Sequence, residues 1–288
     1  MTNEYFGGLD FGSSGARISI INYSKEIIFE DSRNYNYEFR DPNGWINCCI
    51  KLFEGIPNQI KINLSRLSIS ATSGTLVPCG LNGINLGNAI PYNEACTSNS
   101  KKLNLIAGED KFLNNPYSSV AKAIKLIDTF GENIILRHQS DWISGWFLKD
   151  WSYGEESNNL KLGWNTANKS WPESFDSFSL KKSLPLIIKS GSIFGKINQS
   201  IANLLGTNEH LLLISGTTDS NAAFIAAQVK ENEGLTILGT TIVLKKIIKK
   251  TFNHPGITMH KVNGDLICGG SSNAGCGVLS NFFSDLEI

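Results

Sequence analysis

The first 30 residues contain three short apolar runs separated by small polar residues. The runs cover residues 5–11, 16–21 and 25–30, and residues 12–15 and 22–24 separate them. Apolar runs of this length that are bounded by glycine, asparagine and serine predict β-strands. We therefore expect the chain to open with an antiparallel meander of three strands.

Apolar residues recur at helical spacing further along the chain. Trp45, Cys48 and Leu52 follow an aspartate and a proline at positions 41 and 42, a sequence typical of a helix start. The same periodicity predicts helices over residues 94–105 and 118–130, a shorter helix over 138–148 and an alanine-rich helix over 221–228. Residues 150–180 are polar and rich in asparagine and serine, which predicts an irregular segment.

Short strands are also expected at residues 67–71 and 211–214, and each runs into a turn of small polar residues. Residues 235–238 and 242–247 form a further strand pair around a glycine-threonine turn, which repeats the opening pattern. The charged segment 230–234, which ends in glycine, indicates a domain junction. The sequence thus predicts an α/β protein with a duplicated core, divided into residues 1–229 and 230–288, with a ligand cleft between the halves.

The composition is that of an ordinary globular protein whose charges cancel. Among 288 residues, 26 lysines and arginines balance 26 aspartates and glutamates, so no overall field favours nucleic acid or an acidic membrane. The basic run at residues 245–250 is interrupted by two isoleucines and is expected to be a strand end with a solvated face. No segment resembles a membrane span or a signal peptide, so we expect a soluble cytoplasmic protein without nucleic-acid or membrane partners.

The six cysteines do not form a disulfide framework or a metal site. No CxxC pair occurs, and the four histidines fall at no metal-ligand spacing. We therefore expect buried free thiols in a reducing compartment.

Three turns rich in glycine and hydroxyl residues carry the candidate chemistry. They are Gly12-Ser13-Ser14-Gly15, Gly216-Thr217-Thr218-Asp219 and Gly239-Thr240-Thr241. Backbone N–H groups and hydroxyls gathered in such turns suit a phosphate group, and a carboxylate beside them can hold a divalent metal. Each turn alone is more often only structural, but two of them adjoin an aspartate, and together they favour phosphoryl transfer.

Asp10, at the end of the first strand, is the candidate for the metal side of the reaction. Asp219 follows a strand and opens a helix, which should place its carboxylate in a cleft near a positive helix end. Each residue has a structural alternative. Asp219 could be the N-cap of that helix, and Asp10 could be an acid satisfied by the N–H groups of the turn.

With these motifs the chain resembles the FGGY family of carbohydrate kinases, within the superfamily of actin-like, Hsp70-like and hexokinase-like ATPases. The resemblance runs from residues 7–14 to residues 269–275, and residues 138–142 and 161–164 resemble the cyanobacterial and plant-plastid branch that phosphorylates D-ribulose. It implies an α/β fold of the actin-like, ribonuclease H-like duplicated ATPase type, with the second lobe incomplete. It also implies ATP, Mg²⁺ and a sugar as ligands.

The resemblance assigns roles to individual residues. Asp10 corresponds to the acid near the metal and the sugar hydroxyl, Ser73 to a sugar contact, and Asp219 to the general base that takes the proton of that hydroxyl. Phosphate and nucleotide contacts are implied for Gly12, Ser13, Ser14, Gly239, Thr240, Thr241, Gly269 and Gly270. Asp141 beside Trp142 is a further candidate for a sugar contact, with a helix cap and a core aromatic as the alternatives.

Two features depart from the family pattern. Many xylulokinases have Met-His where this chain has Ser73-Gly74, which argues against plain D-xylulose and favours another ketopentose or a polyol. The family also continues well past this length, so we expect a truncated chain. The prediction is ATP-dependent phosphorylation of a ketopentose of the D-ribulose or D-xylulose type, and the alternative is a catalytically impaired sugar-binding remnant. An assembly ATPase of the actin or Hsp70 type would leave the resemblance at Ser73 and Asp141 unexplained.

Overall fold

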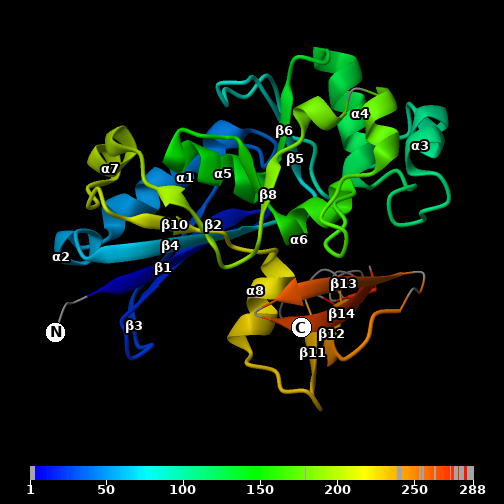
Figure 1. Ribbon diagram of the computed structural model, residues 1–288. Helices are drawn as coiled ribbons and strands as arrows, with labels where there is room; N and C mark the ends of the chain where they lie inside the picture. The colour runs from blue at the N-terminus through cyan, green and yellow to red at the C-terminus, as the bar shows by residue number, and fades with distance from the viewer. Residues whose placement is uncertain are drawn as a thin grey trace. The chain divides into compact units, whose positions relative to one another are not determined.

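The computed structural model describes residues 4–178, 180–238, 242–252, 254, 256–262, 264–272, 274, 275, 278, 282 and 283 (Figure 1). Its contacts divide the chain into two compact units, Met1–Asp219 and Ser220–Ile288. This division falls at the start of helix α8 (Asp219–Ala226), ahead of the junction expected at residues 230–234. The assignment of residues 1–229 and 230–288 to separate roles stays a prediction.

A six-stranded sheet, in the order β3-β2-β1-β4-β10-β9, forms the centre of the first unit. Strands β1 (Tyr5–Phe11), β2 (Gly15–Ile21) and β3 (Ile27–Asn34) pair antiparallel in sequence order, so the expected meander is confirmed. Strands β4 (Leu64–Ala71) and β10 (Leu212–Ile214) continue the sheet on the other side of β1, and β9 (Ile193–Lys196) ends it.

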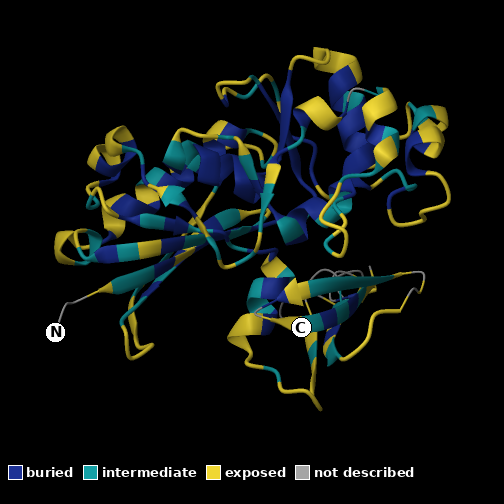
Figure 2. Ribbon diagram, viewed as in Figure 1, coloured by how far each residue is buried: buried dark blue, intermediate teal, exposed yellow. Residues whose placement is uncertain are grey.

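The two faces of this sheet differ in polarity. Helices α1 (Pro42–Gly55) and α5 (Gln139–Leu148) pack on one face, and α7 (Gln199–Leu205) packs beside α1. Toward these helices point alternate strand residues such as Leu9, Phe11 and Ile69, which are almost fully buried. Alternation therefore turns Asp10 and Ser70 to the opposite face, and Figure 2 shows this striping of buried and more exposed positions.

A second cluster of apolar side chains lies in the same unit, around β5 (Leu76–Cys79), β6 (Ile135–His138), α3 (Ser100–Ala107) and α4 (Ser119–Phe130). Helix α4 begins as expected, because the Ser118 side chain accepts a hydrogen bond from the N–H of Ala121 and caps it. The helix expected over 94–105 begins only at Ser100. Cys48, Cys49, Cys79 and Cys96 are buried free thiols and Cys268 is half-buried, while Cys276 lies outside the described residues.

The polar segment 150–180 contains only short elements, as its composition predicts. They are β7 (Tyr153–Glu155), α6 (Glu156–Asn159) and the 3₁₀ turns η1 (Leu160–Leu162) and η2 (Glu173–Phe178). A third turn, η3 (Lys181–Ser183), precedes β8 (Leu186–Ile188), which pairs parallel with β7. A one-turn helix, α2 (Asn58–Lys61), leads into β4.

The second unit is an antiparallel four-stranded sheet, in the order β11-β12-β14-β13, together with α8. Its strands are β11 (Gly234–Leu238), β12 (Ile242–Ile248), β13 (Ile257–Val262) and β14 (Asp265–Ser272). Phe224 of α8 packs with Val262 and Ile267 to form its core. Within the described part of the chain, no helix combines the length and the apolar character that crossing a membrane would require.

Candidate functional site

The site is built at one edge of the first sheet, where three parallel strands end. β1, β4 and β10 run parallel to one another, so their carboxyl ends lie at the same edge. Asp10 is the register partner of Ser70, and Ala71 forms an isolated parallel bridge with Thr218. Because neighbouring strands lie about 4.8 Å apart, the ends of β1 and β10 are separated by about 10 Å. The structure thus brings the turns that follow Asp10, Ala71 and Ile214 together at one edge.

Asp10 is held in place but is not enclosed. The Ser70 hydroxyl donates a hydrogen bond of 2.8 Å to Oδ1, and Nε of Arg17 lies 3.5 Å from Oδ2. The side chain of Asp10 keeps 35% of its exposure, so its carboxylate can still reach a ligand. These contacts differ from the alternative in which N–H groups of the turn satisfy the acid.

The hairpin after β1 presents two serines to solvent. The N–H of Gly12 donates to the carbonyl of Gly15 at 2.9 Å, which closes a tight turn around the exposed Ser13 and Ser14. Tyr35 holds this turn from behind, because its hydroxyl donates to the carbonyl of Gly12 at 2.9 Å and its N–H donates to that of Ser14 at 3.0 Å. No described residue accepts a hydrogen bond from the N–H groups of Ser13 and Ser14. These groups are therefore available to an anion.

A buried hydrogen-bond network fixes the turn after β4. Oε1 of Gln139 accepts from the Thr72 hydroxyl at 2.6 Å and from the Thr72 N–H at 3.2 Å. The hydroxyls of Thr72 and Thr75 lie 2.7 Å apart, and the Thr75 hydroxyl accepts from the N–H of Tyr92. Ser73 remains half-buried at the tip of the turn, where it could contact a substrate.

Two lysines, whose roles the sequence does not predict, bind the carbonyls of this turn. Nζ of Lys161 donates to the carbonyl of Ser73 at 2.8 Å, and Nζ of Lys122 donates to that of Gly74 at 3.1 Å. Burial lowers the pKa of Lys161, while the negative charge of Asp219 acts in the opposite direction. Burial also lowers the pKa of Lys122, to about 8. Lys161 therefore connects the Ser73 turn electrostatically with Asp219.

Asp219 is exposed, and helix α8 begins at this residue. It follows β10 through a turn in which Thr217 and Thr218 are buried. Asp219 thus lies at the N-terminal, positive end of a helix and directly after the Ala71–Thr218 bridge, at the sheet edge where β1 also ends.

Asp141 faces the interior, contrary to the proposed sugar contact. Its Oδ1 accepts from the N–H of Glu155 and its Oδ2 from Nδ2 of Asn159, both at 2.9 Å, and the residue is 1% exposed. Burial raises its pKa to about 7. Trp142 is also a core residue, since it is 4% exposed and its indole N–H donates to the carbonyl of Gly83. These two residues support the fold rather than a ligand.

The metal expected near Asp10 can be tested against the residues present. Among the described residues, no group of three or more His, Cys, Asp or Glu side chains has a metal-binding arrangement. Mg²⁺ does not require such a group when it binds with a nucleotide, because it takes one or two carboxylates, phosphate oxygens and several waters. The single, partly exposed carboxylate of Asp10 fits that mode of binding.

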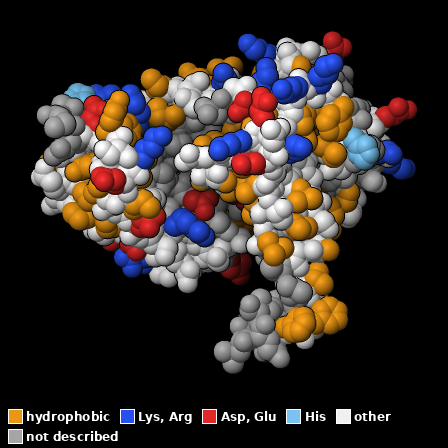
Figure 3. Space-filling model, turned by 90° about the horizontal axis from the view of Figure 1, so that it is seen from below, with side chains coloured by type: hydrophobic (Ala, Val, Ile, Leu, Met, Phe, Trp, Pro, Cys, Tyr) orange, Lys and Arg blue, Asp and Glu red, His pale blue; other side chains and the backbone are white. Residues whose placement is uncertain are grey.

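The predicted nucleotide residues belong to the second unit. Gly239, Thr240 and Thr241 lie outside the described residues. Gly269 and Gly270 lie in β14 and line a pocket of about 390 Å³ with residues of β11 and β12. Figure 3 shows acidic and basic side chains interspersed on the visible face, as the balanced charge of the sequence suggests.

Comparisons with known proteins identify the fold. No protein-family model matches the chain. A xylulose kinase of Staphylococcus epidermidis is 23% identical over 268 residues, which cover 86% of this chain and 54% of that protein. The chain thus spans about half the length of the curated relatives it matches.

Solved structures of carbohydrate kinases superpose on nearly the whole chain. The ligand-bound xylulose kinase of Lactobacillus acidophilus has a TM-score of 0.82 at 15% identity, covering 97% of this chain and 62% of that one. The gluconate kinase of the same organism has a TM-score of 0.84 at 15% identity, with coverages of 99% and 64%. A glycerol kinase of Plasmodium falciparum with ADP gives 0.79 at 18% identity, with coverages of 97% and 64%. The expected α/β fold, which the chain shares with these solved carbohydrate kinases, is confirmed.

Proposed function

We propose that this chain carries the sugar-binding and phosphate-binding edge of an ATP-dependent carbohydrate kinase. The observation that carries the proposal is the parallel register of β1, β4 and β10, which aligns Asp10, the Ser73 turn and Asp219. Phosphoryl transfer needs groups that position the phosphate and a carboxylate that orients the attacking hydroxyl, with little covalent chemistry from the protein. Two carboxylates and two small polar turns at one edge meet these needs.

In this proposal Asp219 acts as the general base. Its exposed carboxylate accepts the proton of a sugar hydroxyl as the oxygen of that hydroxyl attacks the γ-phosphate of ATP. The new bond joins the sugar oxygen to phosphorus, the bond between the γ-phosphorus and the bridging oxygen breaks, and ADP leaves. Ser73 contacts the sugar, and Lys161 holds the Ser73 turn in place through its carbonyl.

Ser13 and Ser14 are proposed to bind phosphate oxygens through their N–H groups and hydroxyls. Bound Mg²⁺ would neutralise phosphate charge, and Asp10 is the residue proposed to hold it or its waters. Gly239, Thr240, Thr241, Gly269 and Gly270 are proposed for the nucleotide side. Residues 1–229 would then bind the sugar, and residues 230–288 would begin the nucleotide-binding lobe.

The proposed substrate is a ketopentose of the D-ribulose or D-xylulose type. The names of the similar proteins support this class, since several of them are xylulose kinases. Ser73-Gly74 in place of Met-His argues against plain D-xylulose and favours another ketopentose or a polyol. A sugar-binding protein with impaired catalysis is the second candidate.

The variant Asp219→Asn tests the role of the base. We expect kcat for D-ribulose phosphorylation to fall by about 10²–10⁴-fold, because general-base catalysis contributes that much. Sugar affinity should change little, since the amide keeps the shape of the carboxylate. Asp176→Asn, an exposed acid in η2, is the matched control and should leave kcat unchanged. ADP release measured with D-ribulose, D-xylulose, L-ribulose and glycerol, beside calorimetric sugar binding, provides both quantities.

Each outcome of this experiment has a definite meaning. Retained turnover in Asp219→Asn would remove Asp219 from the role of base. Sugar binding without ADP release in the parent protein would favour the impaired sugar-binding protein. If the parent protein shows no sugar binding and no ADP release with all four substrates, the proposal is contradicted altogether.

A further inference from the structure

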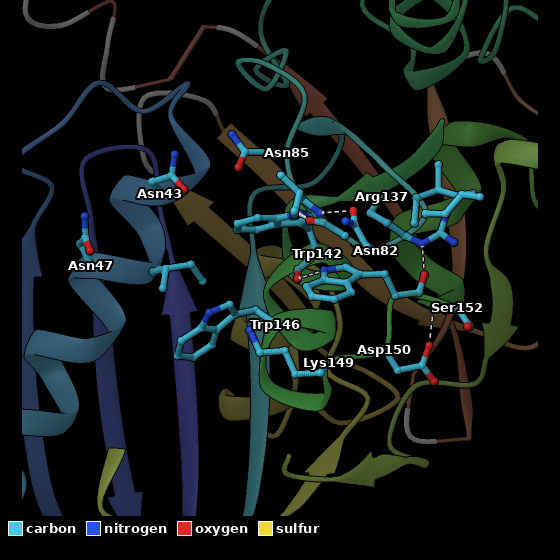
Figure 4. Close-up of a pocket in the computed structure, with 16 residues that line it drawn as sticks. Asn43, Asn47, Asn82, Asn85, Arg137, Trp142, Trp146, Lys149, Asp150 and Ser152 are labelled. Atoms are coloured by element: carbon cyan, nitrogen blue, oxygen red, sulfur yellow. Dashed lines mark hydrogen bonds between the residues drawn. The ribbon is translucent and has the colours of Figure 1, made fainter. Parts of the chain in front are cut away.

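A pocket of about 740 Å³ lies in the first unit, away from the candidate site. It is bounded by α1, by α5 and by the loops after β5 and α5 (Figure 4). In the β5–β6 pair, Leu76 faces His138 next to the Ser73 turn, whereas Cys79 faces Ile135, which lines the pocket. The length of this ladder, roughly 10 Å, separates the two sites. The volume of the pocket falls in the range of small-molecule pockets.

Indole rings form the apolar part of the lining. Trp146 and Trp151 are half-buried, and Nζ of Lys149 lies 5.9 Å from the ring centre of the first and 6.0 Å from that of the second. Trp151 is fixed, because its indole N–H donates to the carbonyl of Trp142 at 3.0 Å. The pocket therefore offers aromatic surface with the Lys149 cation within cation–π distance of both rings.

Amide side chains form the polar part. Asn43 and Asn47 project from α1, and Asn82 and Asn85 belong to the loop after β5. The side chains of Asn47 and Asn85 make no hydrogen bond to any residue that the structure describes. Each amide can donate two hydrogen bonds and accept others, and a hydroxyl group likewise both donates and accepts.

The charged side chains of the pocket already have partners within the protein. The Arg137 guanidinium donates hydrogen bonds to three backbone carbonyls. They are those of Leu136 at 2.7 Å, Ser183 at 2.9 Å and Trp151. Asp150 lines the same pocket as Lys149 and opposes its charge. The polar side chains left for a ligand are the uncharged amides of Asn47 and Asn85, and these suit an uncharged ligand that carries hydroxyl groups.

We propose that this pocket binds a neutral saccharide. The apolar faces of a sugar ring pack on Trp146 and Trp151, and its hydroxyls exchange hydrogen bonds with Asn47 and Asn85. The site is separate from the proposed catalytic edge, and its occupancy does not depend on phosphoryl transfer. It would let the protein respond to a sugar that it does not phosphorylate.

The double variant Asn47→Ala/Asn85→Ala tests the proposal. The full chain is titrated with pentoses, hexoses and their β-1,4-linked disaccharides, and binding is followed by tryptophan fluorescence and by calorimetry. We expect saturable binding of at least one neutral saccharide, weakened at least about tenfold in the double variant. Asn104→Ala, an exposed asparagine in α3, is the matched control and should bind like the parent.

Two further arms separate this site from the catalytic edge and from anion binding. In Asp10→Ala, the binding that depends on Asn47 and Asn85 should persist, even though the candidate catalytic edge is damaged. Inorganic phosphate should bind more weakly than the best saccharide. Tighter binding of phosphate, loss of the signal in Asp10→Ala, unchanged affinity in the double variant, or no saturable binding of any saccharide at millimolar concentration would each overturn the proposal.

Discussion

His138 shows how a single buried residue can make stability depend on pH. Its Nε2 lies 3.1 Å from the Ser119 hydroxyl, and its Nδ1 approaches Oδ2 of Asp141 to 3.9 Å without a hydrogen bond. Burial, followed by the positive charges of Lys161 and Lys122, lowers the pKa of His138 to about 3. The imidazole is therefore neutral at neutral pH, and its contact with Asp141 is not an ion pair.

We predict that the signed slope of the free energy of unfolding against pH is lower in His138→Gln than in the parent, because the variant loses a group whose contribution to stability rises with pH. In the unfolded chain the imidazole binds a proton below about pH 6.5, whereas the folded imidazole does so only near pH 3. Between these values the unfolded state gains protons, so this group lowers stability as the pH falls, by up to about 1.4 kcal/mol per pH unit. Urea denaturation at several pH values between about 7.5 and 4.5 measures the slope.

Asp141 changes the free energy of unfolding with pH in the direction opposite to His138. The slopes must therefore be compared between variants. Burial raises the pKa of Asp141 to about 7, so the folded carboxyl keeps a proton that the unfolded one loses above about pH 4. This group therefore adds stability as the pH falls from about 7 to 4. His210→Gln, an exposed histidine, is the control and should keep the parental slope. A slope in His138→Gln that matches the parent would contradict the assignment.

At the scale of elements, Gly216 allows β10 to lie beside β4. A Cβ atom placed on Gly216 would come within 1.9 Å of the carbonyl oxygen of Ile69, which is a backbone atom of β4 and cannot rotate away. Any larger residue must push the end of β10 away from β4. The alignment of Asp219 with Asp10 depends on that contact.

We predict that Gly216→Ala lowers the free energy of unfolding by about 1–3 kcal/mol or more, the usual cost of overpacking. Sugar phosphorylation should fall more than stability alone explains, because Asp219 moves with the strand end. Urea denaturation and ADP release measure the two effects. Gly8→Ala in β1, where a Cβ would meet nothing closer than 4.0 Å, should be tolerated. Equal stability of the two variants would show that the β4–β10 contact adapts.

Elements with local signals could be predicted from the sequence. The meander of β1 to β3 follows from apolar runs separated by glycine and serine, and α1 and α4 follow from periodicity and from their caps, Asp41 and Ser118. Strands β5 and β6 have four residues each and are buried throughout, so no alternation of apolar and polar side chains reveals them. Helix α3 begins late because residues 94–99 are held by turns and long-range bonds, such as that of the Cys96 N–H to the carbonyl of Pro116.

Some residues of the candidate site could likewise be predicted from the sequence, and others could not. Asp10, Ser73 and Asp219 were predictable because each belongs to a turn that directly follows a strand. Lys122 and Lys161 were not, because a lysine in a helix or a polar segment usually faces solvent. Their roles depend on carbonyls far away in the sequence, those of Gly74 and Ser73. The burial of Asp141 could not be predicted for the same reason, since only the packing of α6 shows that it is enclosed.

At the scale of the whole molecule, the two units differ in the size of their cores. Side chains from the sheet, α1, α5 and α7 form one large cluster in the first unit, with Trp45, Leu52 and Leu67 fully buried. In the described part of the second unit, three buried apolar residues form the core, supported by partly buried neighbours. Burial of apolar area is the main favourable term in folding, at about 25 cal/mol per Å². Burial of apolar area therefore stabilises the second unit less than the first.

We predict that backbone amides of β12 and β14 exchange with deuterium faster than those of β1 and β4 under native conditions. Local opening is governed by the apolar contacts that must be broken, so a sheet with a small core opens at lower free energy than one inside a large core. Exchange followed by mass spectrometry on peptides from the intact chain measures both sheets in one sample. Val262→Ala, which removes part of the small core, should speed exchange in β12 and β14 and leave β1 and β4 unchanged. Equal protection of the two sheets, or a change in β1 and β4 with this variant, would show that the units unfold as one cooperative body.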